Sequence, residues 1–318
     1  MSTRDIALAA VLLASPCGAQ TWPERPIKLV VPFPAGGPTD IIARVVTQAM
    51  AETLGQTIVI ENKGGAGGVT GTDFVAKSAP DGYSFVLSNA GSLAILPSLQ
   101  KMPYRVNVDI KPLMLVAKVP ELLVVPESLP VRSLAEFLAL ARSKPGALNY
   151  ASTGIGAVPH LAAELLKTTA KIDVVHVPFS GAAPAVNELL AGRVQMMFAD
   201  IPILAPHVQA GKLKALAIGS AQRSPVLPDV PTFIELGMAA VEADNWYGFA
   251  MPAATPAAIQ EKLHAAAVKA VRSPDVLKTL AAQGVNLVGG APEDFTAYIA
   301  AESAKWAEVV RIAGIRME

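Results

Sequence analysis

The stretch VPFPAGGPTDIIAR, Val31–Arg44, leads from an apolar β-branched strand through a Pro-Ala-Gly-Gly-Pro-Thr-Asp corner into a helical pattern. Gly36 and Gly37 carry no side chains that would keep a ligand off the backbone. Thr39 and Asp40 stand where a helix N-cap belongs. First-turn amides lack partners inside a helix and the helix dipole is positive there, so the corner suits an anion. An ordinary strand-to-helix turn is the other interpretation of this single loop.

The same pattern recurs twice in the middle of the chain. NYASTGIGAVPHLAAELL, Asn149–Leu166, is again strand, small-residue turn and helix, and VVHVPFSGAAPAVNELL, Val174–Leu190, repeats the Val-Pro-Phe of the first corner. None of the three corners contains a lysine or arginine before the first turn of its helix. Several hydrogen bonds from backbone amides, at roughly 1.5 to 3 kcal/mol each for a charged acceptor, could still hold a small anion.

From Pro26 onward, apolar β-branched runs alternate with amphipathic helical patterns, which is typical of βαβ units. About nine strands are predicted, too many for one ordinary doubly wound sheet, so we expect two mainly parallel sheets flanked by helices. Two extended segments, Val116–Pro130 and Leu213–Pro231, are predicted to cross between lobes and to form a hinge. Lobe one is then 23–120 plus 230–318, and lobe two is 121–229.

The composition excludes several classes of protein. With 52% hydrophobic and 16% charged residues in 318, the chain is not generally disordered. Lys plus Arg (26) equals Asp plus Glu (26) without long runs of either sign, so neither a nucleic-acid surface nor a polybasic membrane patch is indicated. A small ligand is expected.

The N-terminus resembles an export signal. Arg4, an apolar run over 6–14 and small residues up to Ala19 predict a signal peptide over 1–19, although Cys17 leaves a lipoprotein interpretation open. Cleavage after Ala19 would leave no cysteine, and no later segment of the sequence is apolar for long enough to insert into a membrane. Thiol catalysis, disulfides and cysteine-ligated metal would then be excluded.

Catalytic and cofactor motifs are absent from the sequence. There is no G-x-S-x-G elbow, the four histidines show no zinc spacing, and NKGGAGGVTG, Asn62–Gly71, does not fit a nucleotide fingerprint and is interpreted as a flexible turn. His160 is expected either to orient its loop or to contact the ligand. Asp200 is expected either to select an amino or hydroxyl group on the ligand or to cap the next segment. Trp246 and Tyr247 line the cleft or belong to the core.

Several long motifs in order make the chain similar to the Bug family, the extracytoplasmic receptors of tripartite tricarboxylate transporters. They include VPFPAGGPTDIIAR, GGAGGVTG, PDGYSF, YASTGIGAVPH, VPFSGAAPAVNELLAGRV, GKLKALAIGSAQR, PTFIELG and WYGFAMPAATP. The resemblance implies a periplasmic two-lobed fold of the type II-like binding-protein class. It implies ligand-binding positions at Phe33, Ala35, Gly36, Gly37, Asp40, Asn89, Ser152, Thr153, Gly154, Gly156, His160, Pro178, Phe179, Gly181 and Asp200.

Three departures from the family pattern concern the ligand and the packing. Ala157 stands where members commonly have serine, and Phe179-Ser180 replaces a Tyr-Lys or similar pair, which favours a more apolar or aromatic carboxylate. The third departure is YRVNVDIKP, Tyr104–Pro112, which differs from the usual family motif and is expected to affect packing more than specificity.

The expected function is that of a monomeric periplasmic solute-binding protein without cofactor, metal or catalytic residues. It would close over a small mono- or dicarboxylate and deliver it to membrane transporter subunits. The alternatives are a carboxylate-sensing receptor of a signalling system and an α/β hydrolase or oxidoreductase.

Overall fold

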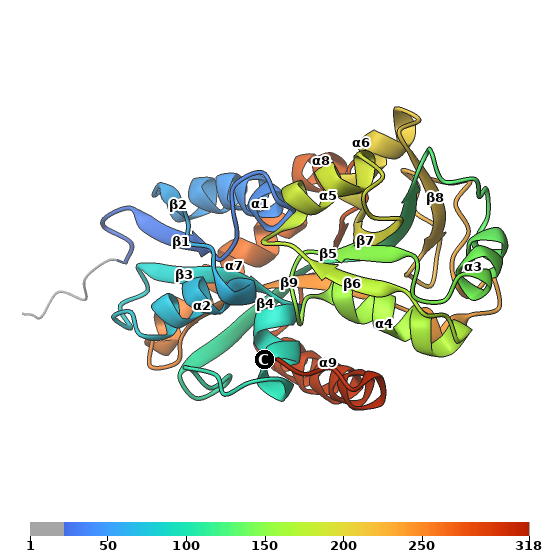
Figure 1. Cartoon of the computed structure of the whole chain (residues 1–318). Helices are drawn as coiled ribbons and strands as arrows, with labels where there is room; N and C mark the ends of the chain where they lie inside the picture. The colour runs from blue at the N-terminus through green and yellow to red at the C-terminus, as the bar shows by residue number, and fades with distance from the viewer. Residues whose placement is uncertain (1–21, 318) are drawn as a thin grey trace, which may run out of the picture.

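The structure, a computed structural model, describes residues 22–317 and has an α/β architecture with two lobes (Figure 1). The predicted signal peptide lies outside the described residues. The strands are β1 (Ile27–Val31), β2 (Ile58–Asn62), β3 (Ser84–Asn89), β4 (Ile110–Pro126), β5 (Asn149–Ser152), β6 (Val175–Pro178), β7 (Met196–Asp200), β8 (Leu213–Ile218), β9 (Asp244–Pro252) and β10 (Asn286–Leu287). The α-helices are α1 (Pro38–Leu54), α2 (Val69–Ala76), α3 (Leu134–Ser143), α4 (Val158–Ala170), α5 (Ala182–Leu190), α6 (Ile201–Gln209), α7 (Ala257–Val271), α8 (Pro274–Ala281) and α9 (Pro292–Ala313), with short helical turns η1 (Ala66–Gly68), η2 (Gly91–Ile95), η3 (Leu96–Ser98) and η4 (Ala239–Val241).

The strands follow the order β2-β1-β3-β9-β4-β7-β5-β6, with β8 and β10 paired to β4. Pairs β1–β2, β1–β3, β5–β6 and β5–β7 are parallel, as βαβ units require. Pairs involving β4 and β9 are antiparallel. Both halves of the sheet are therefore mixed rather than mainly parallel. The antiparallel pairs arise because β4 and β9 are not joined to their neighbours by the crossover helices that parallel pairs require.

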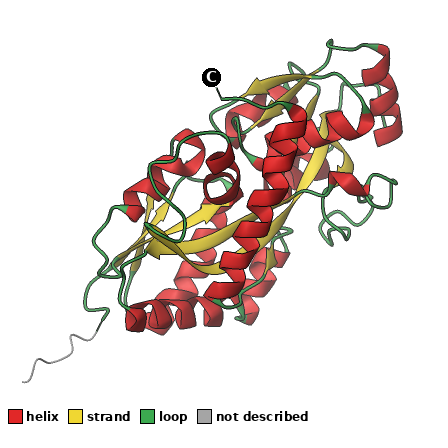
Figure 2. Cartoon of the chain, turned by 90° about the horizontal axis from the view of Figure 1, so that it is seen from below, coloured by secondary structure: helices red, strands yellow, loops and turns green. Residues whose placement is uncertain are grey.

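Strand β4 joins the two lobes without a break. Residues Ile110–Pro120 pair with β9, and the next residue, Glu121, begins the pairing with β7. The sequence predicted only Leu122–Val125 as strand and treated the residues around it as an extended crossing; the observed strand has 17 residues. Figure 2 shows strands running from one lobe into the other between helices that cover the sheet.

The second connection between the lobes is the irregular segment from 219 to 243. Phe233 stacks on Phe198 of β7 with ring centroids 5.8 Å apart, and Thr232 forms a bridge with Ile218 of β8. This segment therefore packs against strands β7 and β8 before the chain continues into β9.

Each lobe has its own core. In lobe one, α1, α7 and α8 bury residues such as Val46, Leu263 and Leu280 against the sheet. In lobe two, α4 packs on one face, and α5 and α6 contribute Leu189 and Leu204 on the other. The last helix, α9, was predicted to belong to lobe one, but it contacts both α4 and η2 and so packs against both lobes.

Two elements were not predicted. Helix α6 contains Pro202 and Pro206 within a short apolar run, which weakens its helical pattern. Strand β10 has two residues. Within residues 22–317 no helix is both long and apolar enough to cross a membrane.

Candidate functional site

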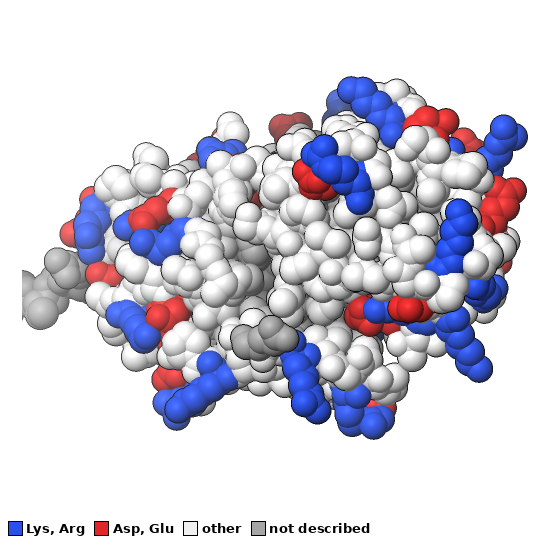
Figure 3. Space-filling view, viewed as in Figure 1, with Lys and Arg blue, Asp and Glu red and all other residues white. Residues whose placement is uncertain are grey.

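The sheet topology brings the ends of several strands to the junction of the lobes. Asn89, the last residue of β3, pairs with Tyr247 of β9, and Asp200, the last residue of β7, pairs with Glu121 of β4. The corners that follow parallel strands β1, β5 and β6 lie at the same ends of their sheets. In the space-filling view, the surface between the two lobes is hollowed, and Lys, Arg, Asp and Glu gather on the outer parts of each lobe (Figure 3).

The lobes touch along one side of this hollow. A Cβ atom at Gly91, which follows β3, would lie 3.5 Å from the carbonyl oxygen of Gly156 in lobe two. A Cβ atom at Gly156 would come 2.5 Å from Leu96, and the φ of Gly156 is +76°. Glycine is therefore required at position 156 both by its backbone conformation and by the approach of the other lobe.

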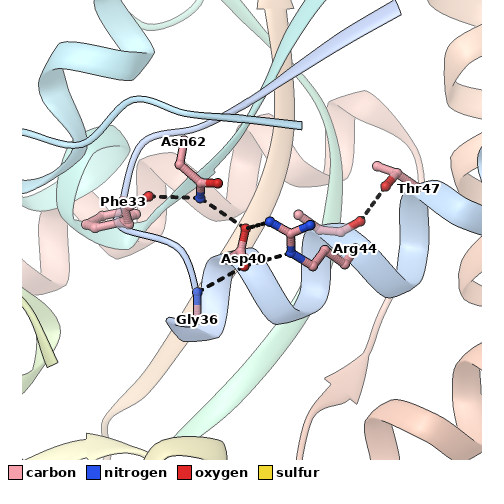
Figure 4. A network of polar contacts seen from close by, with 7 residues as sticks. Phe33, Gly36, Asp40, Arg44, Thr47 and Asn62 are labelled. Atoms are coloured by element: carbon pink, nitrogen blue, oxygen red, sulfur yellow. Dashed lines mark hydrogen bonds and ion pairs between the residues drawn. The ribbon is translucent and has the colours of Figure 1, made fainter. Parts of the chain in front are cut away.

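The first corner is shaped by the buried carboxylate of Asp40 (Figure 4). The amide of Gly36 donates to Oδ2 of Asp40 at 3.0 Å, and Arg44 donates to both oxygens at 2.8 and 3.0 Å. Asn62 at the end of β2 donates to Oδ1 of Asp40 and to the carbonyl oxygen of Phe33. Burial opposes ionisation, but these hydrogen bonds outweigh it and lower the pKa of Asp40.

Two expectations for this corner are corrected by that network. Both oxygens of Asp40 are occupied within the protein, so Asp40 orients the loop instead of offering its side chain to a ligand. The amide of Gly36 is occupied as well. Helix α1 has Gly37 as its N-cap, without a side-chain cap from Thr39 or Asp40. Among the described residues, the amides of Gly37, Thr39 and Asp40 have no hydrogen-bond partner, and they remain available to an anion.

The loop after β2 packs on the first corner. A Cβ atom at Gly68 would lie 2.9 Å from the ring of Phe33, and one at Gly64 would lie 3.5 Å from Pro34. Gly68 also has a φ of +95°. The glycine cluster Asn62–Gly71, interpreted from the sequence as a flexible turn, is thus a closely packed support for Phe33.

The second corner rests on a column of stacked rings. Tyr150 of β5 stacks on His176 of β6 at 4.7 Å between centroids, and His176 stacks on His160 of α4 at 4.1 Å. Nε2 of His176 lies 2.6 Å from Oγ of Ser152, and Nδ1 of His160 accepts the amide hydrogen of Gly156 at 3.2 Å. Burial lowers the pKa of His160 to about 3 and that of His176 to about 4, so both rings are neutral at pH 7.

His160 therefore orients its loop, the first of the two roles considered for it, and its 4% exposure leaves little surface for a ligand. The amide of Gly154 is also taken, by Oγ of Ser152 at 3.2 Å. The amides of both Gly154 and Gly156 are therefore occupied within the protein. Within the described chain, the amides of Thr153 and Val158 have no partner.

The third corner exposes the N-terminus of α5. Phe179 donates its amide to the carbonyl oxygen of Ser152, which ties the third corner to the second at 3.1 Å. Gly181 is the N-cap with a φ of +139°, and a Cβ atom there would meet nothing within 4 Å. In the part of the chain that the structure describes, the amides of Ala182 and Ala183 have no partner, and Pro178 is exposed beside them.

Asp200 joins lobe two to lobe one. It is 3% exposed and accepts from Nδ2 of Asn245 at 3.1 Å and from the hydroxyl group of Tyr247. The hydroxyl group of Tyr247 also accepts from Nδ2 of Asn245 at 2.9 Å. Asp200 is the N-cap of α6 but makes no side-chain cap, so the capping role considered for it is not observed.

Two predicted positions remain: Ala35 is exposed in the first corner, and Asn89 serves the turn into η2. Its Oδ1 accepts from the amide and hydroxyl groups of Ser92 at 3.3 Å. Of the two aromatic residues considered for the cleft, Trp246 is core and donates to Glu302, whereas Tyr247 belongs to the Asp200 network. Sequence reasoning missed Asn245 and Glu121. The signal for Glu121 was a single acid within the apolar run VPELLVV.

Anion binding at this site would rely on uncharged donors. Arg44 is held by Asp40, and the two ring-stacked histidines are neutral. What the corners offer is a set of unpartnered amides at the starts of α1, α4 and α5, on both lobes.

Comparison with known proteins identifies the family of the chain. Residues 42–315 match the family described as the tripartite tricarboxylate transporter family receptor, TctC. The periplasmic binding protein BugD is 35% identical, with a TM-score of 0.87 over 93% of this chain and 100% of that chain.

Two similar structures contain ligands. The R. palustris protein Rpa4515 with adipate is 35% identical, with a TM-score of 0.89 over 93% of this chain and 99% of that chain. MatC from Rhodopseudomonas palustris with bound malate is 37% identical, with a TM-score of 0.85 over 91% of this chain and 100% of that chain. The chain therefore belongs to the tripartite tricarboxylate transporter receptor family, the Bug family of solute-binding proteins.

Proposed function

We propose that this protein captures a small mono- or dicarboxylate between its lobes in the periplasm and delivers it to the membrane subunits of a tripartite tricarboxylate-type transporter. The observation that carries the proposal is the set of unpartnered helix-start amides on both lobes, on α1 in lobe one and on α4 and α5 in lobe two. A ligand with anionic groups at both ends would find donors on each side. The adipate and malate held by two relatives are of this chemical class.

The magnitude is consistent with binding through neutral donors. Micromolar affinity requires about 8 kcal/mol. Hydrogen bonds to a charged acceptor contribute roughly 1.5 to 3 kcal/mol each, so four to six of them would meet that requirement after the cost of immobilising the ligand. A helix dipole adds at most ~2 kcal/mol. Amides of the three corners could supply that number without a cationic side chain.

Isothermal titration against mono- and dicarboxylates of increasing length, adipate and malate included, tests the proposal. We expect saturable binding of at least one dicarboxylate by the exported form of the protein. Failure of every member of the panel to bind a preparation shown by circular dichroism to be folded would reject the proposal.

A substitution that removes one amide tests the role of the corners. Ala182→Pro deletes the first N–H of α5 at a position where proline fits the helix. We expect the Kd to rise at least about tenfold, the loss of one charge-assisted hydrogen bond.

Ala257→Pro is the matched control, because it deletes the corresponding amide of α7, which starts at the far end of β9 from the hollow. It should leave the Kd unchanged. Equal effects of the two substitutions would show that the start of α5 does not contact the ligand. Transport by cells that lack the receptor gene, restored by this protein, tests delivery to the transporter.

A further inference from the structure

The carboxyl group of Glu121 is fully buried at the point where β4 passes from one lobe to the other. Its exposure is 0%, and neither oxygen receives a hydrogen bond from a donor within residues 22–317. An ionised carboxylate buried without donors is very costly, and such a group is neutralised instead. The geometry at Glu121 is therefore that of a carboxylic acid.

The neighbour across the strand pair is a second carboxyl group. Glu121 and Asp200 are register partners in the antiparallel β4–β7 pair, so their side chains lie next to each other on the same face of the sheet. Asp200 already accepts from Asn245 and from Tyr247. Because Asp200 has these donors and Glu121 has none, the negative charge resides on Asp200 and the proton on Glu121.

The groups that act on Glu121 all favour its protonated form. Burial raises the pKa of Glu121 well above its usual range, and the charges of Asp200 and Asp244 raise it further. Tyr247, from β9, faces the same pair through Asp200.

We propose that Glu121 is a carboxylic acid at neutral pH and donates its proton to Asp200, so that one shared proton fixes the hydrogen-bonded pair Asp200–Tyr247 across the two lobes. Asp200 belongs to lobe two, and Tyr247 belongs to the sheet of lobe one. Glu121 is thus a positioning residue for the junction of the two lobes. Its effect on ligand affinity rests on the proposed function; the location of the proton does not.

Infrared spectroscopy locates the proton without any ligand. Wild-type protein at neutral pH should show the C=O stretching band of a protonated carboxyl group, and Glu121→Gln should abolish it. Glu302→Gln is the matched control, because Glu302 is also buried but, unlike Glu121, accepts hydrogen bonds from the indole N–H groups of Trp246 and Trp306. The band should survive in this control.

A measurement on the wild-type protein covers the case in which the variant does not fold. With ¹³C-labelled glutamate carboxyl groups, one resonance should keep the chemical shift of a protonated acid at neutral pH. Absence of both the resonance and the infrared band would overturn the proposal, as would a band that persists unchanged in folded Glu121→Gln.

The pH dependence of ligand affinity tests the positioning role. Because the pKa of Glu121 is raised, the shared proton is present below that pKa and is lost as the pH rises through it. Wild-type affinity for a bound dicarboxylate should therefore weaken at alkaline pH, whereas Glu121→Gln keeps a donor that does not titrate and should bind with pH-independent affinity. Identical alkaline profiles for the two proteins would refute the positioning role while leaving carboxylate binding itself intact.

Discussion

Replacement of Asp40 by alanine should destabilise the protein substantially, because Asp40 ties three parts of lobe one together. The carboxylate accepts one bond from Gly36, one from Asn62 and two from Arg44, at 2.8 to 3.0 Å. The bonds from Gly36 and Asn62 are worth roughly 1 kcal/mol each, since both donors can return to water. Arg44 is 56% exposed and adds at most about 1 kcal/mol.

The expected cost of Asp40→Ala is therefore about 2 to 3 kcal/mol, which corresponds to a fall in Tm of roughly 3 to 5 °C for a chain of this length. Urea denaturation followed by tryptophan fluorescence measures it. The control is Arg44→Ala, which removes only the exposed partner and should cost less than about 1 kcal/mol.

The wild-type protein and Asp40→Ala should also differ in how their stability depends on pH in acid. Because the pKa of Asp40 is lowered in the fold, its contribution is present above the unfolded pKa and is lost as the pH falls through the folded pKa. Over that pH range, the free energy of unfolding should fall by more in the wild-type protein than in Asp40→Ala. If Asp40→Ala costs no more than Arg44→Ala, the view that the carboxylate shapes the first corner is refuted.

Further predictions follow from the glycines and the buried polar groups. Gly156→Ala should destabilise more than Gly36→Ala in thermal unfolding, because both have positive φ but only position 156 also meets Leu96 at 2.5 Å; equal losses would contradict the contact between lobes. The pKa of His160 is lowered to about 3, so wild-type stability should fall as the pH drops from about 6.5 towards that value, and His160→Gln should flatten this dependence in acid titrations. Glu302→Ala leaves two buried indole N–H groups without an acceptor and should cost about 2 kcal/mol or more in urea denaturation; a cost near zero would mean that water replaces the carboxylate.

Local pattern predicted most of the elements because the chain alternates strands and helices with clear boundaries. Helix Leu134–Ser143 and strand Leu213–Ile218 were predicted with the bounds that the structure shows. Strand β4 was underestimated because Pro112, Lys118 and Pro120 interrupt its apolar run. Pro112 is tolerated because it lies where the register of β4 with β9 shifts.

The site was harder to predict, since loop chemistry depends on partners distant in sequence. Small residues and helix starts correctly indicated three corners after strands. The pattern could not show that Asp40 takes the amide of Gly36, or that His160 takes that of Gly156. Asn62 and Asn245 contact these loops across 22 and 45 residues of sequence, which no local motif encodes.

The unbroken strand β4 has a consequence for how the protein folds. A single strand that supplies hydrogen-bonding edges to both halves cannot be divided without exposing unpaired backbone in each half. Neither half is therefore a self-sufficient folding unit, and helix α9, which packs on both, adds a second such dependence. Loss of structure in one half removes the template for the other, so the cooperativity of the molecule extends over the whole chain.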